Sequence, residues 1–303
     1  MKKIIAFWKR TSKETSWKIF YRQDKKLSIL EDDNKQFIEY QIGDKNKWAA
    51  DPLVFETSKG TFLFFELFDK KTNKGSIACS AITDGKIGKY EIVLDEPFHL
   101  SFPFVFEFND SFYMIPETGA KKQIILYKAL DFPYKWRSEK VLLENINSSD
   151  NIVFFHDKTL FLLSSIIYST ASCCSNLLFN LDKELRINDK IIETPASVDG
   201  ARNAGPILAK GDKLIRVGQF CPNNEYGKGL CFFEINNDNG IFSEKLLKII
   251  LPNDISFPKE DKYFGVHTYS YAHNLEFIDA KVTKKRYFLV RLSILIKRIF
   301  SRK

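Results

Sequence analysis

Five segments of this chain open in the same way, and this repetition restricts the fold more than any other feature. The openings, each of which leads into a short apolar run, are Asp51–Phe55, Phe102–Phe106, Asp150–Phe154, Asn203–Ile207 and Gly265–Tyr269. They recur about every 50 residues, a spacing typical of propeller blades rather than of helical repeats. Each of the first four units adds a polar turn and a second apolar run that ends on a polar residue. The sequence therefore predicts a ring of blades.

Composition favours strands throughout. Of the 303 residues, 28 are Phe and 12 are Tyr, and such large planar side chains fill the half-buried surface of a pleated sheet. Long helical periodicity is absent before residue 280. We expect an all-β chain with a five-bladed β-propeller over residues 48–280. N-terminal strands over 1–47 would close the ring, and a short basic amphipathic C-terminal helix would occupy 281–303.

The positive charge is concentrated at the C-terminal end. The formal net charge is +8, but residues 281–303 hold nine Lys or Arg and no acidic residue, so the rest of the chain carries about −1. A nucleic-acid-binding domain spreads basic residues over a folded face, so we expect no nucleic-acid partner. As a helix, the tail places Lys284, Arg291, Arg298 and Arg302 on one stripe, which is typical of helices on anionic membranes. A helix docked on the propeller is the alternative.

Cysteine usage and the apolar segments favour a cytoplasmic protein. The five Cys show no framework spacing, which indicates reduced thiols. The stretch Ile4–Trp8 is too short for the core of a signal peptide, and no stretch is long and apolar enough to span a bilayer. With the basic tail, we expect a peripheral position at the inner face of the cell membrane.

Propeller geometry predicts that polar residues from distant blades meet. Because the first strand of every blade lines one central channel, residues at the openings should converge; these are Asp51, Asp150, Arg202 and His267. Asp51, in Trp48-Ala49-Ala50-Asp51-Pro52, is either a general base or only a turn-forming residue before proline. Asp150 holds the same place in the third blade, and two carboxylates in one channel push their pKa values apart.

Further candidates lie near the same end of the blades. Trp48 would be an aromatic platform for a sugar face, and His99 leads into the second blade. Glu66, Glu117 and Gln219 close second strands, as ligands for sugar hydroxyls or as ordinary strand-end polar residues. We expect no cofactor, and dependence on a divalent metal stays open.

Several motifs resemble one known family over roughly residues 48–271. They are Trp48–Pro52, Glu96–Phe106, Tyr113–Glu117, Ala201–Pro206, Gly218-Gln219 with Tyr226-Gly227, and Gly265–Thr268. Together they resemble the N-terminal propeller domain of plant glucosamine inositolphosphorylceramide transferase and its bacterial relatives. That domain is similar to the five-bladed propellers of arabinanases, invertases and levansucrases. The resemblance implies a carbohydrate-active scaffold, with Tyr226 among the substrate-binding residues. In the plant proteins a separate glycosyltransferase domain follows the propeller.

One departure from the arabinanase-like pattern bears on the reaction. Those hydrolases use an Asp base in blade one, a second Asp in blade three and a Glu acid in blade four. The resemblance matches the first two to Asp51 and Asp150, but the acid falls at Ala204. Hydrolysis of an unactivated glycoside needs that acid, whereas a nucleotide or phosphate leaves as a stable anion.

The expected function is therefore glycosyl transfer from an activated donor. The acceptor would be a cell-surface glycan or glycolipid, with Asp51 as the base and Arg202 and His267 binding the donor's phosphate or sugar. Two alternatives remain: a glycoside hydrolase whose acid is Glu117, and a non-catalytic glycan-binding partner of a separate transferase.

Overall fold

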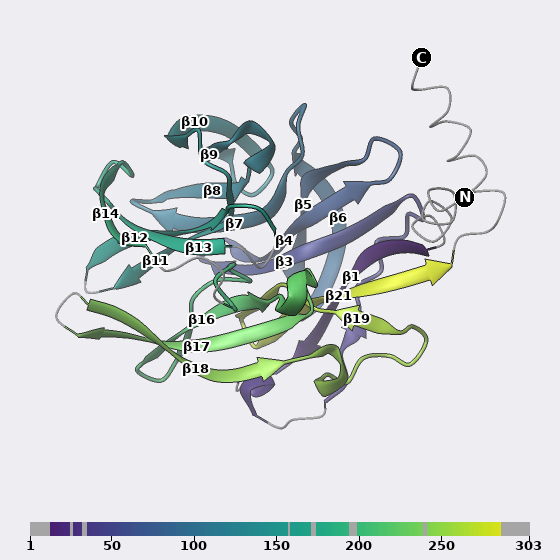
Figure 1. The fold of residues 1–303 in the computed structure, drawn as a ribbon. Helices are drawn as coiled ribbons and strands as arrows, with labels where there is room; N and C mark the ends of the chain where they lie inside the picture. The colour runs from purple at the N-terminus through teal and green to yellow at the C-terminus, as the bar shows by residue number, and fades with distance from the viewer. Residues whose placement is uncertain are drawn as a thin grey trace, which may run out of the picture.

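The structure, a computed structural model, describes residues 13–24, 27–31, 35–156, 158–170, 174–193, 199–238 and 241–285. Its strands form five sheets arranged around a common centre (Figure 1). The predicted all-β, five-bladed propeller is confirmed. Within the described ranges, helical structure is limited to the short 3-10 turns η1 (Ser28–Leu30), η2 (Gly119–Lys121), η3 (Pro222–Asn224) and η4 (Pro252–Asp254).

Four blades are built from consecutive antiparallel strands. Blade I holds β3 (Lys47–Thr57), β4 (Gly60–Asp69), β5 (Lys74–Thr83) and β6 (Lys86–Leu94). Blade II holds β7 (Ser101–Phe108), β8 (Ser111–Glu117), β9 (Gln123–Asp131) and β10 (Lys135–Glu144). Blade III holds β11 (Ser148–His156), β12 (Thr159–Ile167), β13 (Cys174–Leu181) and β14 (Ile187–Glu193). Blade IV holds β15 (Leu208–Lys210), β16 (Lys213–Phe220), β17 (Gly229–Asp238) and β18 (Ile241–Ile250).

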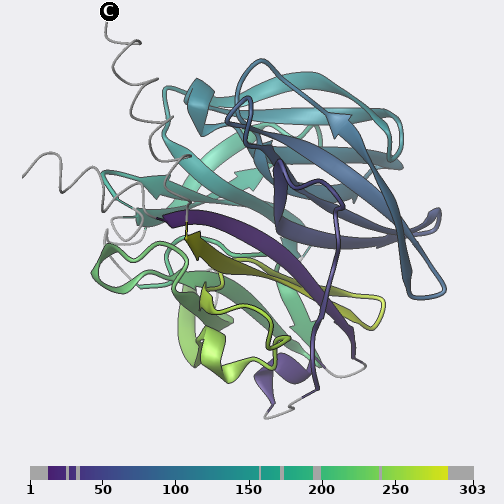
Figure 2. The ribbon, with the colours of Figure 1, turned by 90° about the vertical axis from the view of Figure 1, so that its right-hand side faces the viewer.

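The fifth blade joins the two ends of the described chain. It contains β19 (Tyr263–Gly265), β20 (Tyr269–Ala272), β21 (Leu275–Lys285), β1 (Lys13–Gln23) and β2 (Ile38–Glu39). β1 pairs with β21 along its whole length, from Lys13 opposite Lys285 to Gln23 opposite Leu275. Figure 2 shows the two strands side by side. The ring is thus closed by main-chain hydrogen bonds between an N-terminal and a C-terminal strand.

Three of the five repeated openings in the sequence are bulges in the structure. The register shifts at these points in blades I, II and III, between Ala50 and Leu53, Ser101 and Phe104, and Ser149 and Ile152. The residue at each bulge has a left-handed backbone, with φ of 53° at Asp51, 43° at Phe102 and 50° at Asp150. A bulge re-aims a side chain and ends regular pairing, and Asp tolerates the left-handed region better than most residues do. The repeat therefore marks where side chains leave the sheet pattern.

The C-terminal strand extends past the boundary expected at residue 280. β21 continues to Lys285, so Lys281 and Lys284 are strand residues and do not belong to the expected helix. The remainder of that helix, residues 286–303, lies outside the described residues. Among the residues described, no helix has the length and apolar character needed to cross a bilayer.

Candidate functional site

The predicted site residues meet at one end of the propeller. In each blade the first strand starts at this end and the second strand returns to it, so bulges and second-strand ends lie together. Ala50, beside the Asp51 bulge, pairs with Glu66, and Ser101 pairs with Glu117. The five acidic residues gathered here, termed the carboxylate cluster, are Asp51, Glu66, Glu117, Asp150 and Asp279. The charges of the other four raise the pKa of Glu66, after burial, which is the largest cause.

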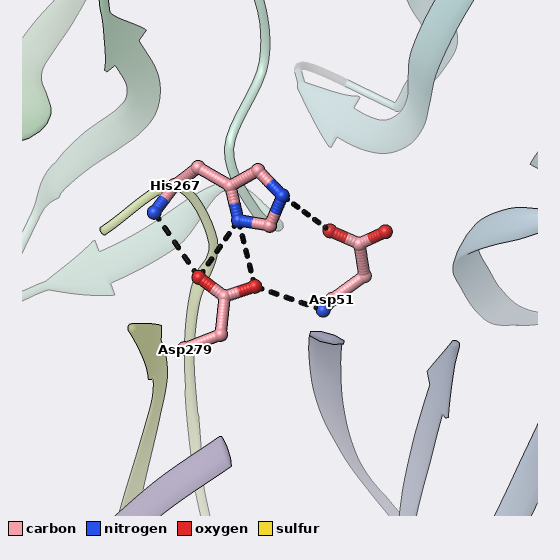
Figure 3. Close-up of side chains that lie close together, drawn as sticks. All are labelled: Asp51, His267 and Asp279. Carbon is pink, nitrogen blue, oxygen red and sulfur yellow. Dashed lines mark hydrogen bonds and ion pairs between the residues drawn. The ribbon is translucent and has the colours of Figure 1, made fainter. Parts of the chain in front are cut away.

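Asp279 of β21 holds the centre of the site together (Figure 3). It accepts the backbone N–H groups of Asp51 at 2.9 Å, His267 at 3.1 Å and Thr268 at 3.0 Å. His267 Nδ1 lies 2.7 Å from Asp279 Oδ2. Four donors therefore surround one carboxylate and use its lone pairs. Sequence reasoning missed Asp279, although an acid inside the apolar run Leu275–Ala280 was a signal that could have found it.

The imidazole of His267 links Asp279 to Asp51. Because Nδ1 donates to the carboxylate of Asp279, Nε2 faces Asp51 Oδ1, at 3.6 Å. Burial lowers the pKa of His267, but the charge and hydrogen bond of Asp279 outweigh burial and hold that pKa above its usual value. A carboxylate oxygen of Asp51, a ring nitrogen of His267 and a carboxylate oxygen of Asp279 lie within 4.8 Å of one another, close enough for a metal site. The donors around Asp279 favour a hydrogen-bonded chain of three side chains over a set of metal ligands.

Asp51 is buried, and both of its oxygens accept hydrogen bonds. The Thr268 hydroxyl donates to Oδ1 at 2.8 Å, and the N–H of Phe102 donates to Oδ2 at 3.0 Å. Burial raises the pKa of Asp51, and the neighbouring His267 opposes that rise only in part. The bulge of blade I is thereby tied to the bulge of blade II and to blade V.

Asp150 lies opposite two nitrogen donors from blade IV. Arg202 Nε donates to Asp150 Oδ2 at 2.5 Å, and Gln219 Nε2 donates to the same oxygen at 3.1 Å. Arg202 Nη2 also reaches Glu117 Oε2 at 3.3 Å, and the Ser149 hydroxyl donates to that oxygen. Burial raises the pKa of Asp150 to about 6, although Arg202 acts against the rise.

Aromatic rings cover His267. Trp17 of β1 stacks on the imidazole, with ring centroids 3.7 Å apart and planes 9° apart. Tyr226 lies edge-on to His267 at 5.3 Å, and the Arg202 guanidinium lies 4.9 Å from the centre of the Tyr226 ring. Gly227 (φ 61°) permits this arrangement, because a Cβ there would come within 2.8 Å of Trp17. Sequence reasoning missed Trp17, which only the closure of the ring brings to the site.

Trp48 and His99 reach the cluster indirectly. Trp48 stacks on Phe68 at 4.4 Å, and Phe68 lies edge-on to His99 at 6.1 Å. The N–H of Gly75 donates to His99 Nδ1 at 2.9 Å, and Nε2 lies 3.6 Å from Glu66 Oε1. Trp48 is therefore linked to Glu66 through the rings of Phe68 and His99.

Ala204, where the resemblance places a general acid, packs among apolar side chains. Its side chain is fully buried in an apolar cluster that includes Leu208 and Val217. Its backbone nevertheless joins two blades, because its carbonyl accepts the N–H of Tyr269 at 2.7 Å. The position contributes packing and a main-chain contact, and no acid.

Two buried acceptor atoms in the site have no hydrogen-bond donor among the described residues: Glu66 Oε1 and Gln219 Oε1. Both belong to second-strand ends predicted to bind sugar hydroxyls. A buried polar atom without a partner is costly, and a hydroxyl group is the kind of donor that would satisfy it. The burial also raises the pKa of Glu66 far above its ordinary value.

Comparison with known proteins identifies the family. A family model described as glucosamine inositolphosphorylceramide transferase 1, N-terminal, matches residues 38–263. The chain belongs to this family. The Arabidopsis thaliana glucosamine inositolphosphorylceramide transferase 1 is 32% identical over 206 residues, which are 60% of this chain and 25% of that protein. The protein of the same name from Oryza sativa subsp. indica is 30% identical over 207 residues, 64% of this chain and 27% of that one. The chain thus spans about a quarter of the length of these relatives.

Solved structures show the same fold in glycoside hydrolases. The catalytic domain of an α-L-arabinofuranosidase from Coprinopsis cinerea has a TM-score of 0.57 at 11% identity, covering 78% of this chain and 93% of that one. An enzyme from Xanthomonas citri, solved with xylotriose, has a TM-score of 0.56 at 11% identity, covering 81% and 89%. At such low identity these likenesses show the fold alone. The predicted resemblance, to the transferase propeller and to arabinanase-like folds, is confirmed.

Proposed function

We propose that this domain carries out glycosyl transfer from a nucleotide- or phosphate-activated sugar to a glycan or glycolipid acceptor. Membership in a family named for a glucosamine transferase supports the reaction class. The observation that carries the assignment to this site is a pair of unsatisfied buried acceptors. They are Glu66 Oε1, in the carboxylate cluster, and Gln219 Oε1, whose amide nitrogen binds Asp150 of that cluster. Sugar hydroxyls would supply the missing donors.

Asp51 is the proposed general base. Its carboxylate is fixed by Phe102 and Thr268, and its raised pKa brings it closer to the value that suits a base near neutral pH. In the proposed step, Asp51 takes the proton of an acceptor hydroxyl. The acceptor oxygen bonds to the anomeric carbon, and the bond from that carbon to the donor's phosphate oxygen breaks. The phosphate departs with the electron pair, so no acid is needed at position 204.

The remaining residues would position the sugar. Asp150 and Glu117 both bind Arg202, which fixes the guanidinium against the Tyr226 ring. His267 is held by Asp279 and faces Asp51, so it supports the base rather than the donor.

A glycoside hydrolase is the second candidate, and Glu66 favours it. Hydrolysis needs a protonated acid, and burial raises the pKa of Glu66 far above its ordinary value. Burial therefore favours the protonated form of Glu66, which is the form that a general acid needs. Glu117, the acid expected from the sequence, instead accepts hydrogen bonds from Ser149 and Arg202.

Substrate panels test these functions. The purified full chain is incubated with nucleotide sugars, including a glucosamine-type donor, and with oligosaccharide and inositolphosphorylceramide acceptors. It is separately incubated with aryl glycosides. We expect transfer that Asp51→Asn lowers by about 10²–10⁴-fold, while the exposed Asp110→Asn leaves it unchanged. Aryl glycoside hydrolysis that Glu66→Gln abolishes would favour the hydrolase. Glycan binding without any reaction would favour the third alternative, a non-catalytic glycan-binding partner of a separate transferase.

We also propose that residues 286–303 hold the domain on an anionic membrane at the cytoplasmic face. Six Lys or Arg and no acid lie in this stretch, beside apolar residues. β21 runs from Leu275 past Asp279 to Lys285, so this strand ends beyond the carboxylate cluster. A membrane bound there would place the site near a lipid-linked acceptor.

A further inference from the structure

Lys281 is a cation near the site that has no role in the proposed reaction described above. It follows Asp279 by two residues on β21, and alternate residues of a strand share a face. It pairs with Trp17 of β1 on one side and with Gly265 of β19 on the other. Its Nζ lies 5.2 Å from the centre of the Trp17 ring and 5.5 Å from that of Tyr226, and it donates to the Tyr226 carbonyl.

The ammonium group of Lys281 has spare hydrogen-bonding capacity. No carboxylate of the described residues lies within 4.0 Å of its Nζ. Lys18, on the neighbouring strand, differs, because its Nζ lies 2.7 Å from Glu39 and 2.8 Å from Asp261. An ammonium carries three donors, and the Tyr226 carbonyl uses one. Burial lowers the pKa of Lys281, as expected for a cation with little solvent and no ion-pair partner.

The two cations of the site come from neighbouring blades, Arg202 from blade IV and Lys281 from blade V. Asp279 also lies in blade V, whereas the other four carboxylates, Asp51, Glu66, Glu117 and Asp150, come from blades I to III. The Tyr226 ring lies near both cations, 4.9 Å from the Arg202 guanidinium carbon and 5.5 Å from Lys281 Nζ. Arg202 is already bound to Asp150 and Glu117. Lys281 is therefore the cation of this pair whose charge is open to a ligand.

We propose that Lys281 binds a phosphate group of the substrate, beside the Tyr226 ring, while the sugar lies over the carboxylate cluster. This inference rests on the proposed glycosyl transfer. A phosphate offers strong acceptor oxygens to the two remaining N–H donors and supplies the counter-charge that Lys281 lacks. Two sources have this chemistry, the phosphate of an activated donor and the phosphodiester of a phosphorylated lipid acceptor.

Inorganic pyrophosphate is the probe, titrated into the full chain at low salt by calorimetry. We expect Lys281→Met to weaken binding at least tenfold and Lys281→Arg, which keeps the charge, to restore most of it. The matched control is Lys284→Met, on the same strand but exposed, with unchanged binding. Equal affinity in wild type and Lys281→Met, or no binding to wild type, would overturn the proposal.

A second measurement needs no variant and so does not depend on the folding of one. Lysines of the wild-type chain are acetylated with limiting reagent, and the extent of acetylation at each lysine is measured by mass spectrometry. We expect pyrophosphate to protect Lys281 and not Lys284, and equal labelling with and without pyrophosphate would contradict the proposal.

Kinetics separate this inference from the proposed function. If transfer occurs, Lys281→Met should raise the KM for the donor when the donor's phosphate is bound, or the KM for the acceptor when the lipid's phosphodiester is bound. Transfer with both KM values unchanged would contradict the proposed role of Lys281 but would still support glycosyl transfer as the function. If pyrophosphate binds through Lys281 but no donor supports transfer, the anion site is supported and the proposed glycosyl transfer is contradicted.

Discussion

The carboxylate of Asp279 accepts the backbone N–H of Asp51, 228 residues earlier in the chain, at 2.9 Å. The same carboxylate binds the N–H groups of His267 and Thr268 and the imidazole of His267. It therefore joins the last blade to the first at the point where the proposed base lies. A buried carboxylate in this position fixes backbone conformation as well as charge.

Asp279→Asn should destabilise the propeller. The amide nitrogen would face backbone N–H groups that need an acceptor, and His267 would lose its charged partner. Leaving buried donors unpaired costs 1–3 kcal/mol each, so we expect a loss of about 3 kcal/mol in the free energy of unfolding, measured by urea denaturation. The exposed Asp212→Asn is the control and should change stability little. A variant as stable as wild type would show that Asp279 does not hold the blades together.

Trp17→Ala should also cost stability, because Trp17 is buried, stacks on His267 and lies beside Lys281. Truncation of a buried Trp typically costs 3–5 kcal/mol. Trp48→Ala is the comparison, since Trp48 is only partly buried and stacks on Phe68. Thermal unfolding of both variants should show the larger loss at Trp17. The reverse order would mean that ring closure does not depend on the Trp17 stack.

Asp150 should titrate with a pKa of about 6, because burial outweighs the attraction of Arg202. Carbon-13 NMR of its carboxyl group measures this value directly, and an ordinary value near 3.8 would contradict the burial argument. A pKa raised by folding means that the native state binds the proton more tightly than the unfolded chain does. This contribution to stability is fully present below pH 3.8 and is lost as pH rises through about 6.

The same shift predicts how Asp150→Asn behaves with pH. The amide mimics the protonated carboxyl, so the variant should gain stability relative to wild type as pH rises from 4 to 7. From the values of 3.8 and about 6, the gain is on the order of 3 kcal/mol. Urea denaturation at several pH values checks it, with Asp212→Asn as the control. A difference between variant and wild type that does not change with pH would be the contrary result.

The sequence predicted the ring and the convergence of Asp51, Asp150, Arg202 and His267, because the repeat marks the start of each blade and these starts lie at one end of the ring. In blades I to III it also marks a bulge. Asp279 was missed because the second strand of the last blade was not compared with the other four, where a polar residue ends the apolar run. Trp17 was missed because its partner, Lys281, is 264 positions away and only the register of β1 on β21 brings them together. Lys281 was assigned to a basic tail because a count of charges ignores that strand alternation continues to Lys285.

Membrane binding should depend on residues 286–303 and not on the lysines of β21. A chain that ends at Lys285 keeps the whole of β21, including Lys281, and should remain folded. Each Lys or Arg near an anionic surface contributes about 1 kcal/mol, an attraction that salt screens. We expect the full chain to float with anionic vesicles at low salt and to be partly released at high salt. The shortened chain should remain in the unbound bottom fraction. Neutral vesicles are the control. If both chains float equally, the tail does not anchor the protein, and the proposed position at the membrane is wrong.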